Sequence, residues 1–274
     1  MASPAVPAVI EQRDLGWGSL PVWLRRAILL ALVIAAWYLY IWVAHPKSLL
    51  FASPWETAKT FWNGWSDGSL AGPTWRTVKL LLEGTGIGLG VGLLLTAFAT
   101  LTKVGEDLLT LLTSIFNPLP GVAVLPLAML WFGLNENAIL FVIANATVWP
   151  IAINVSTGFR TTNQTLVAVG RNIGLSRLRL ISDVLAPAAL PHAISGVKTA
   201  WAFGWRTVIA AELVFGVAGS KGGLGAYINN AHLYLLVPPM FAGLVTIAVL
   251  GVAFESLFAA LERRTVVRWG MKTS

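Results

Sequence analysis

The sequence predicts an all-α membrane protein with six transmembrane helices. Hydrophobic residues make up 56% of the 274-residue chain and charged residues only 11%, and the mean hydropathy is +0.73. A soluble domain typically has about 25% charged residues, so this composition argues against one. Long apolar runs, each near the roughly 20 residues that a helix needs to cross a bilayer, alternate with shorter polar segments.

The first span is expected at residues 27–44, after a mixed, polar segment over 1–26. Its tryptophans and tyrosines gather toward the far end, as in the aromatic belt of a membrane interface. No small-residue cleavage site clearly follows, so we predict a retained span and not a signal peptide. Within 27–73, the part after this span is predicted to lie outside, where Ser53 and Pro54 open a short amphipathic helix in the interface.

The transmembrane core is predicted over residues 74–262. Its spans are expected at 74–101, 108–134, 138–158, 193–218 and 238–261. Three prolines interrupt the second of these runs. In the first, Gly84, Gly88 and Gly92 recur at four-residue spacing, which predicts close contact with another helix. A nucleotide-binding loop is not indicated there, because no strand precedes the glycines.

Lysines and arginines are distributed unequally between the connecting segments. With the N-terminus inside, thirteen of the 19 lie in inside segments, five lie outside and Arg206 lies within a span. Because cytoplasmic loops carry the excess of positive residues, both termini and the segment 164–192 are predicted to face the cytoplasm. Residues 263–274 are then expected to form a cytoplasmic C-terminal tail.

Segment 164–192 is the most polar and basic run between the spans, and it predicts a helical hairpin. Thr165 is expected to cap a first short helix, Gly174 to end it and Ser176 to cap a second. The second helix is expected to keep one apolar face and to stop before two prolines. The apolar face comprises Leu178, Ile181 and Leu185, and the two prolines are Pro187 and Pro191.

Four stretches carry a family resemblance: NPLPGVAVLPLAMLWFGL (117–134), RNIGLSRLRLISDVLAPAALP (171–191), WRTVIAAELVFG (205–216) and GGLGAYI (222–228). In the hairpin, Gly174 is followed after nine residues by Val184-Leu185-Ala186-Pro187. This spacing resembles the EAA loop of binding-protein-dependent ABC transporter permeases, whose pattern is E-A-A, three residues, glycine, nine residues, then I-x-L-P. Together the stretches are similar to permeases of the nitrate/sulfonate/taurine group, and the resemblance covers roughly residues 54–270.

The resemblance implies a type I ABC importer permease fold with a cytoplasmic coupling helix, in a bacterial inner membrane. It also implies two permease copies, expected to be a homodimer, docked on two ATP-binding cassette ATPase subunits, with a periplasmic binding protein that delivers the solute. ATP would bind to the partner, so the chain is expected to need no cofactor, to be no enzyme and to have no nucleic-acid partner. The solute stays open among nitrate, alkanesulfonates, taurine, aromatic acids and thiamine precursors.

The resemblance assigns ATPase coupling to one part of the hairpin, namely Ala168, Val169, Gly170, Arg171, Asn172, Gly174, Leu175, Ser176 and Arg177. The family's E-A-A falls on residues 168–170, so its glutamate is absent, and its leucine is replaced by Ala186. We therefore expect docking by shape and through the arginines. In the alternative interpretation these arginines only face anionic lipid headgroups, each gaining about 1 kcal/mol.

Polar residues at membrane depth are candidates for the translocation pathway, because a charge there costs about 2.5–3.5 kcal/mol and usually faces the protein interior. Arg206 either lines the pathway and attracts an anionic solute or pairs with Glu83 or Glu212. Since six residues separate Arg206 from Glu212, the two do not share a helix face, which favours a partner from another span. Glu212 is the second charged candidate for the pathway. Three further candidates either hydrogen-bond across helices or contact solute, and these are Asn117, Asn145 and Thr147.

Catalytic and metal-binding patterns are absent from the sequence. The chain has no cysteine, its three histidines are scattered, and it has no HExxH, paired-carboxylate or Walker pattern. Ser195, three residues after His192, lacks a third orienting group and is not indicated as a nucleophile. The alternative to a permease subunit is a self-sufficient secondary transporter or channel. That class predicts an inverted repeat, and the interrupted second core run has no matching half.

Overall fold

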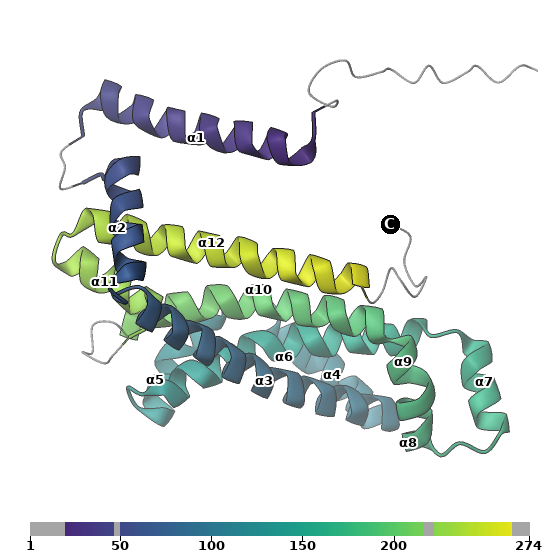
Figure 1. Ribbon diagram of the computed structural model, residues 1–274. Helices are drawn as coiled ribbons and strands as arrows, with labels where there is room; N and C mark the ends of the chain where they lie inside the picture. The colour runs from purple at the N-terminus through teal and green to yellow at the C-terminus, as the bar shows by residue number, and fades with distance from the viewer. Residues whose placement is uncertain (1–19, 47–49, 216–221, 265–274) are drawn as a thin grey trace, which may run out of the picture.

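A computed structural model describes residues 20–46, 50–215 and 222–264 of the chain. Five long helices run alongside one another in Figure 1, and they are α1 (Val22–Ala44), α3 (Ala71–Leu101), α6 (Glu136–Thr161), α10 (Leu190–Phe215) and α12 (Val237–Glu262). The short helices α7 (Gln164–Asn172) and α8 (Arg177–Leu180) lie at one end of this bundle. At the other end lie α2 (Pro54–Ser66) and α11 (Leu224–Leu233).

The expected six spans are confirmed when two bent helix pairs each count as one crossing. Four helices of the described segments, α1, α3, α6 and α12, are long and apolar enough to cross a membrane by themselves. The first bent pair joins α4 (Lys103–Phe116) to the stretch Gly121–Phe132, which contains α5 (Leu125–Phe132), at an angle of 93°. The second joins Arg177–Ala188 to α10 at 73°.

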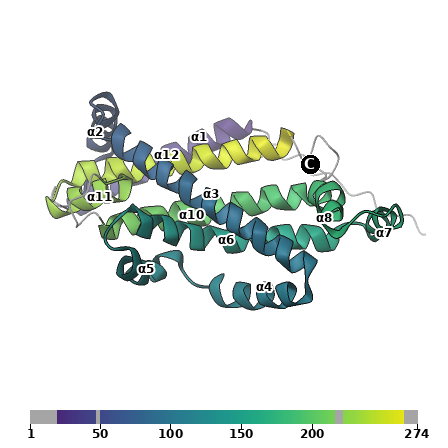
Figure 2. The ribbon, with the colours of Figure 1, turned by 90° about the horizontal axis from the view of Figure 1, so that it is seen from below.

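The first bend lies where the prolines predicted an interruption. The α4 helix ends at Phe116, and Pro118 and Pro120 follow at once. Neither proline has the backbone N–H that a continuing helix would donate, so the chain turns before it resumes in α5. Figure 2 shows α4 and α5 on one flank of the bundle and α12 on the opposite flank.

The glycine spacing in α3 produces the predicted close contact. Gly84, Gly88 and Gly92 are buried against α6, and a Cβ on Gly84 would lie 2.6 Å from the Cβ of Ile143. A Cβ on Gly88 would overlap the hydroxyl of Thr147. Small residues therefore bring the backbones of α3 and α6 together, as in other membrane helix pairs.

Gly88→Ala should destabilise the bundle, whereas Gly90→Ala should not. Gly88 has no room for a methyl group, and overpacking a core typically costs about 1–3 kcal/mol. Nothing lies within 4 Å of a Cβ on Gly90, where alanine gains up to about 1 kcal/mol of helix propensity. Thermal unfolding of the purified chain in detergent, followed by circular dichroism, measures the difference. Equal unfolding temperatures for the two variants would contradict the packing.

The predicted amphipathic helix is confirmed as α2. Ser53 and Glu56 form a capping box at its start, in which the Ser53 side chain accepts from the Glu56 N–H at 3.2 Å. Trp55 and Trp62 are exposed, whereas Phe61 packs toward α11 and α12. The helix lies crosswise to α12 in Figure 1, the orientation of a helix in the membrane interface.

Several boundaries differ from the prediction. The first helix begins at Val22, five residues before the expected 27, so the double arginine lies inside it and most of the predicted segment 1–26 lies outside the described residues. The third span begins with α4 at Lys103, five residues before the expected 108. For the fifth span, α10 is described as far as Phe215, and residues 216–218 of the expected range lie outside the described residues. The tail 263–274 is described only as far as Arg264.

Candidate functional site

A cavity of about 410 Å³ opens at the break between α4 and α5. Aromatic and apolar side chains form most of its wall, and its polar members are Asn117, Arg206 and Thr207. Trp149 of α6 stacks on Phe116 of α4 at this wall, with ring centroids 5.2 Å apart and planes at 10°. The cavity therefore combines an apolar surface with one guanidinium at membrane depth. We call it the upper cavity.

Arg206 has neither of the carboxylate partners that the sequence suggested. The Oε1 atom of Glu83 lies 3.8 Å from the Nζ atom of Lys79, one turn earlier on the same helix. Glu212 is bound elsewhere, and among the described residues no carboxylate forms an ion pair with Arg206. Neither Glu83 nor Glu212 is therefore the partner of Arg206, and solute contact by Arg206 stays a prediction.

Glu212 lies away from the upper cavity and holds the start of α11. Its side chain is buried and accepts from the Thr77 hydroxyl of α3 at 2.8 Å and from the Gly225 N–H at 3.0 Å. The N–H of Leu224 in turn donates to Thr77 at 2.8 Å. Gly223, the N-cap of α11, has no side chain that could accept from the first N–H groups of the helix. Thr77 of α3 and Glu212 of α10 accept these hydrogen bonds instead.

Asn145 and Thr147 also lie outside the wall of the upper cavity. Thr147 is fully buried and donates to the Ile143 carbonyl at 2.9 Å, inside the α3–α6 contact. Asn145 accepts from the indole N–H of Trp149 at 3.4 Å, while its own buried amide nitrogen has no partner. Asn145 can therefore orient Trp149, a wall residue. Direct solute contact by Asn145, Thr147 or Glu212 stays a prediction.

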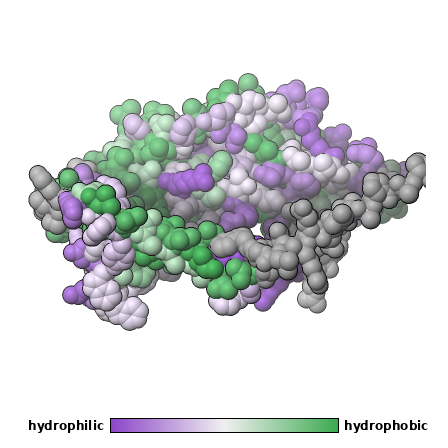
Figure 3. All heavy atoms as spheres, turned by 90° about the horizontal axis from the view of Figure 1, so that it is seen from above, coloured by the Kyte–Doolittle hydropathy of each residue, from purple (hydrophilic) through white to green (hydrophobic). Residues whose placement is uncertain are grey.

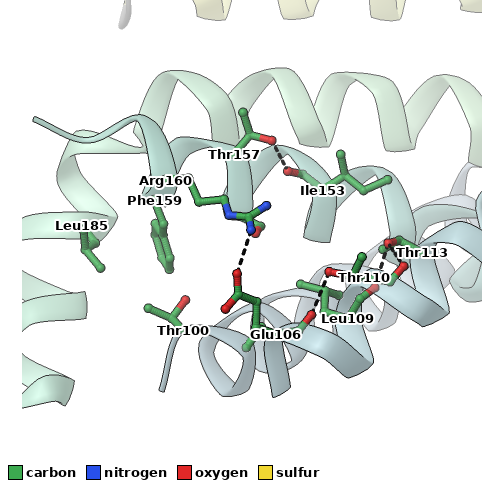
Figure 4. A pocket seen from close by; sticks show the side chains of 12 residues that line it. Thr100, Glu106, Leu109, Thr110, Thr113, Ile153, Thr157, Phe159, Arg160 and Leu185 are labelled. Carbon is green, nitrogen blue, oxygen red and sulfur yellow. Dashed lines mark hydrogen bonds and ion pairs between the residues drawn. The ribbon is translucent and has the colours of Figure 1, made fainter. Parts of the chain in front are cut away.

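A second cavity, of about 380 Å³, lies between the other ends of α4 and α6. Figure 4 shows threonine hydroxyls on its wall and, across it, an ion pair between Arg160 and Glu106 at 2.7 Å. We call it the lower cavity. This cavity is not predicted from the sequence. The available signal is weak: Thr110 and Thr113 stand three residues apart before Asn117, and Thr157 follows Thr147 by ten residues.

The hairpin has the predicted helices, but its first cap differs. Asn163, and not Thr165, caps α7, because its side chain accepts from the N–H of Thr165 at 2.8 Å. Gly174 ends the first arm with a φ of 82°, a left-handed conformation that favours glycine. Ser176 caps α8 as predicted, accepting from the Arg179 N–H at 3.4 Å.

The second arm does not stop before the prolines. A π-helical turn at Ile181–Leu185 leads into α9 (Ala186–Ala188) and then α10, with Pro187 and Pro191 at helix starts, where a missing N–H costs nothing. Its buried face also differs from the prediction. Leu180 and Leu185 are buried with Val167 of α7, whereas Leu178 is 68% exposed.

The outer side of the hairpin is an exposed apolar face, formed by Leu166, Val169, Ile173 and Leu178. The first three recur at helical spacing along α7 and its C-cap. Among the predicted coupling residues, Ala168 and Asn172 are also exposed, while Gly170 is buried against Leu180. Figure 3 shows hydrophilic side chains gathered toward the end of the molecule where this hairpin lies.

Two of the three hairpin arginines, Arg171 and Arg177, lie toward the bundle. Arg177 donates to the carbonyl of Leu101 at the end of α3 at 3.0 Å. Arg171 lines a hollow between the hairpin and the α3–α4 turn, together with Lys103 and Leu175. The expectation that these arginines mediate docking stays a prediction.

Long apolar helices, two bent helix pairs and cavities between them are typical of a multi-pass membrane transport subunit. Residues 86–267 match the family of binding-protein-dependent transport system inner membrane components, and the chain belongs to that family. It is the membrane-spanning permease subunit of an ATP-driven importer in the inner membrane, and ATPase and binding-protein partners follow from the family.

The relatives confirm the resemblance to the nitrate/sulfonate/taurine group. The chain is 32% identical to the putative aliphatic sulfonates transport permease protein SsuC of Escherichia coli, over 86% of this chain and 88% of that protein. It is 27% identical to the taurine transport system permease protein TauC of the same species, over 81% and 74%. An amino acid ABC transporter chain of known structure has the same fold, with a TM-score of 0.59, 17% identity and coverage of 74% and 98%.

Proposed function

We propose that the chain forms the translocation pathway for a small organic anion of the aliphatic-sulfonate class, with the upper cavity as its binding site. The observation that carries this proposal is the guanidinium of Arg206, which pairs with no carboxylate of the described residues, in a wall that is otherwise largely aromatic and apolar. A sulfonate with a short alkyl chain needs a cation for its head and an apolar surface for its tail. The similarity to SsuC and TauC supports the same solute class.

The hairpin is the part through which ATP drives the pathway. Its apolar outer face is available to an ATPase subunit, and its inner face is fixed to the bundle by Leu180, Leu185 and the Arg177 contact. A movement of the ATPase is therefore transmitted to α3 and α10 as a rigid-body shift, a common way of switching between two states. Two identical permease copies would place two such hairpins on two ATPases.

The distribution of lysines and arginines between the connecting segments supports a cytoplasmic position for both termini and for the hairpin. We infer that the chain has no catalytic activity of its own and that the partner binds ATP. A self-sufficient channel is the competing function, and it would need no hairpin with an exposed apolar face.

Solute uptake by the complete transporter in proteoliposomes tests the proposed function. The chain is co-purified with its ATPase subunits, and uptake of labelled ethanesulfonate is followed with its binding protein outside and ATP inside. We expect ATP-dependent uptake that excess taurine or butanesulfonate inhibits and that an uncharged alcohol of the same length does not. Ethanesulfonate uptake by the chain alone, without ATPase subunits, would instead support a channel. Absence of sulfonate uptake would contradict the solute class.

A further inference from the structure

The upper and lower cavities lie one helix turn apart along the same pair of helices. From α4, Phe116 lines the upper cavity and Thr113 the lower one. From α6, Trp149 lines the upper cavity and Ile153 the lower one. The stacked rings of Phe116 and Trp149 thus cross the seam between α4 and α6 at the level where one cavity gives way to the next.

The lower cavity differs from the upper one in chemistry. Its wall carries hydroxyls from both helices, including those of Thr110, Thr113 and Thr157, and the guanidinium of Arg160. Each of these threonines donates to a backbone carbonyl of its own helix, Thr157 to Ile153 at 2.8 Å. Such a carbonyl already accepts a helix N–H, so the hydroxyl can redirect its proton to a ligand at small cost.

Arg160 is held by a carboxylate that has a second partner. Glu106 Oε1 accepts from Arg160 at 2.7 Å, and Glu106 Oε2 accepts from Lys103 at 2.8 Å. If Arg160 turns toward an incoming anion, Glu106 therefore keeps an ion pair with Lys103. The exchange leaves no unpaired carboxylate, and it costs little because Arg160 and Lys103 are 68% and 78% exposed, where an ion pair contributes about 0–1 kcal/mol.

We propose that the lower cavity is a second binding site for the anionic group of the solute, on its way to the cytoplasm, with Arg160 as its cation. This inference rests on the proposed function and adds a site below the Phe116–Trp149 stack. The solute would leave Arg206 when the rings separate, bind the hydroxyls and Arg160, and depart when Glu106 recovers the guanidinium. Apolar lipid tails are unsuited to a wall with this many polar groups.

The absence of cysteine from the chain allows a direct test with single thiols. Thr113→Cys places a thiol in the lower cavity, and Ser114→Cys places one beside it on an exposed face. The two positions are matched, since both hydroxyls donate to the Thr110 carbonyl, at 3.0 and 2.8 Å. Inside-out vesicles holding the complete transporter are treated with the anionic reagent methanethiosulfonate ethylsulfonate or with its cationic trimethylammonium counterpart, and labelling of the chain is measured by mass.

We expect the ratio of anionic to cationic labelling rates, each divided by the rate with a free thiol, to be about tenfold higher for Thr113→Cys than for Ser114→Cys. A nearby guanidinium gives an effect of this order, because its attraction for an anion and its repulsion of a cation both enter the ratio and are only partly screened at close range. Arg160→Gln in the Thr113→Cys chain should remove the preference, and Glu106→Gln should increase it by releasing Arg160. Excess ethanesulfonate should slow labelling of Thr113→Cys by the anionic reagent.

Equal ratios at the two positions, or a preference that survives Arg160→Gln, would overturn the lower site. So would a lack of reaction at Thr113→Cys, which would indicate a wall facing lipid. These rates are measured without ATP or uptake, so the two proposals fail separately. Normal sulfonate uptake with equal ratios removes only the lower site, whereas an anion preference without sulfonate uptake removes only the proposed solute.

Discussion

Arg206→Gln should lower ATP-dependent uptake of an aliphatic sulfonate by about 30-fold, while Arg206→Lys should retain most of it. Glutamine removes a charge-assisted hydrogen bond to the sulfonate, and such bonds contribute about 2 kcal/mol, which corresponds to about 30-fold in affinity. Lysine keeps the positive charge but loses the forked geometry of the guanidinium. Uptake of labelled ethanesulfonate in proteoliposomes, at solute concentrations below saturation, measures the effect.

Lys198→Gln is the matched control for Arg206→Gln. Lys198 lies on the same helix, α10, but it pairs with Glu255 of α12 at 2.6 Å and is not part of the upper cavity wall. Removing its charge should change uptake little, because an exposed ion pair contributes about 0–1 kcal/mol. An equal loss in both variants, or a loss that tracks reduced amounts of folded chain, would assign Arg206 a structural role and contradict solute binding.

The number of spans could be predicted from sequence because hydropathy is a local property. Residues 27–44 are apolar throughout and 238–261 contain a single charged residue, Glu255, while Pro118 and Pro120 remove backbone donors wherever the chain places them. The left-handed turn at Gly174 is local in the same sense. The cap of α7 was assigned to Thr165 because threonine is a usual cap, but Asn163 stands two residues earlier and caps at least as well.

The candidate site could be predicted only in part, because its geometry depends on residues far apart in the chain. The bond between Thr77 and Glu212 joins positions 135 residues apart, so the sequence left Glu212 among the pathway residues. Arg160 was counted only as a cytoplasmic charge, and its partner Glu106 lies 54 residues away. Helix α11 was missed because its ten residues are too few for a span and follow a glycine-rich run.

Val169→Asp should uncouple uptake from ATP hydrolysis. Val169 is 52% exposed on the outer face of α7, between Leu166 and Ile173, so its aspartate variant should fold normally. In the assembled transporter the new carboxylate would be buried against the ATPase without a partner, and such a burial costs about 2 kcal/mol or more, or at least about 30-fold in docking affinity. Co-purification of the ATPase subunits and the solute-stimulated rate of ATP hydrolysis should both fall.

Val104→Asp provides the same change on a surface without a proposed role in docking. Val104 is 73% exposed near the start of α4, where a negative charge suits the helix N-terminus. It should leave co-purification and stimulation unchanged, and Val169→Leu, which keeps the face apolar, should behave like the natural chain. Normal coupling in Val169→Asp would overturn the apolar docking face. Coupling would then have to depend on Arg171 and Arg177, against their contacts with the bundle.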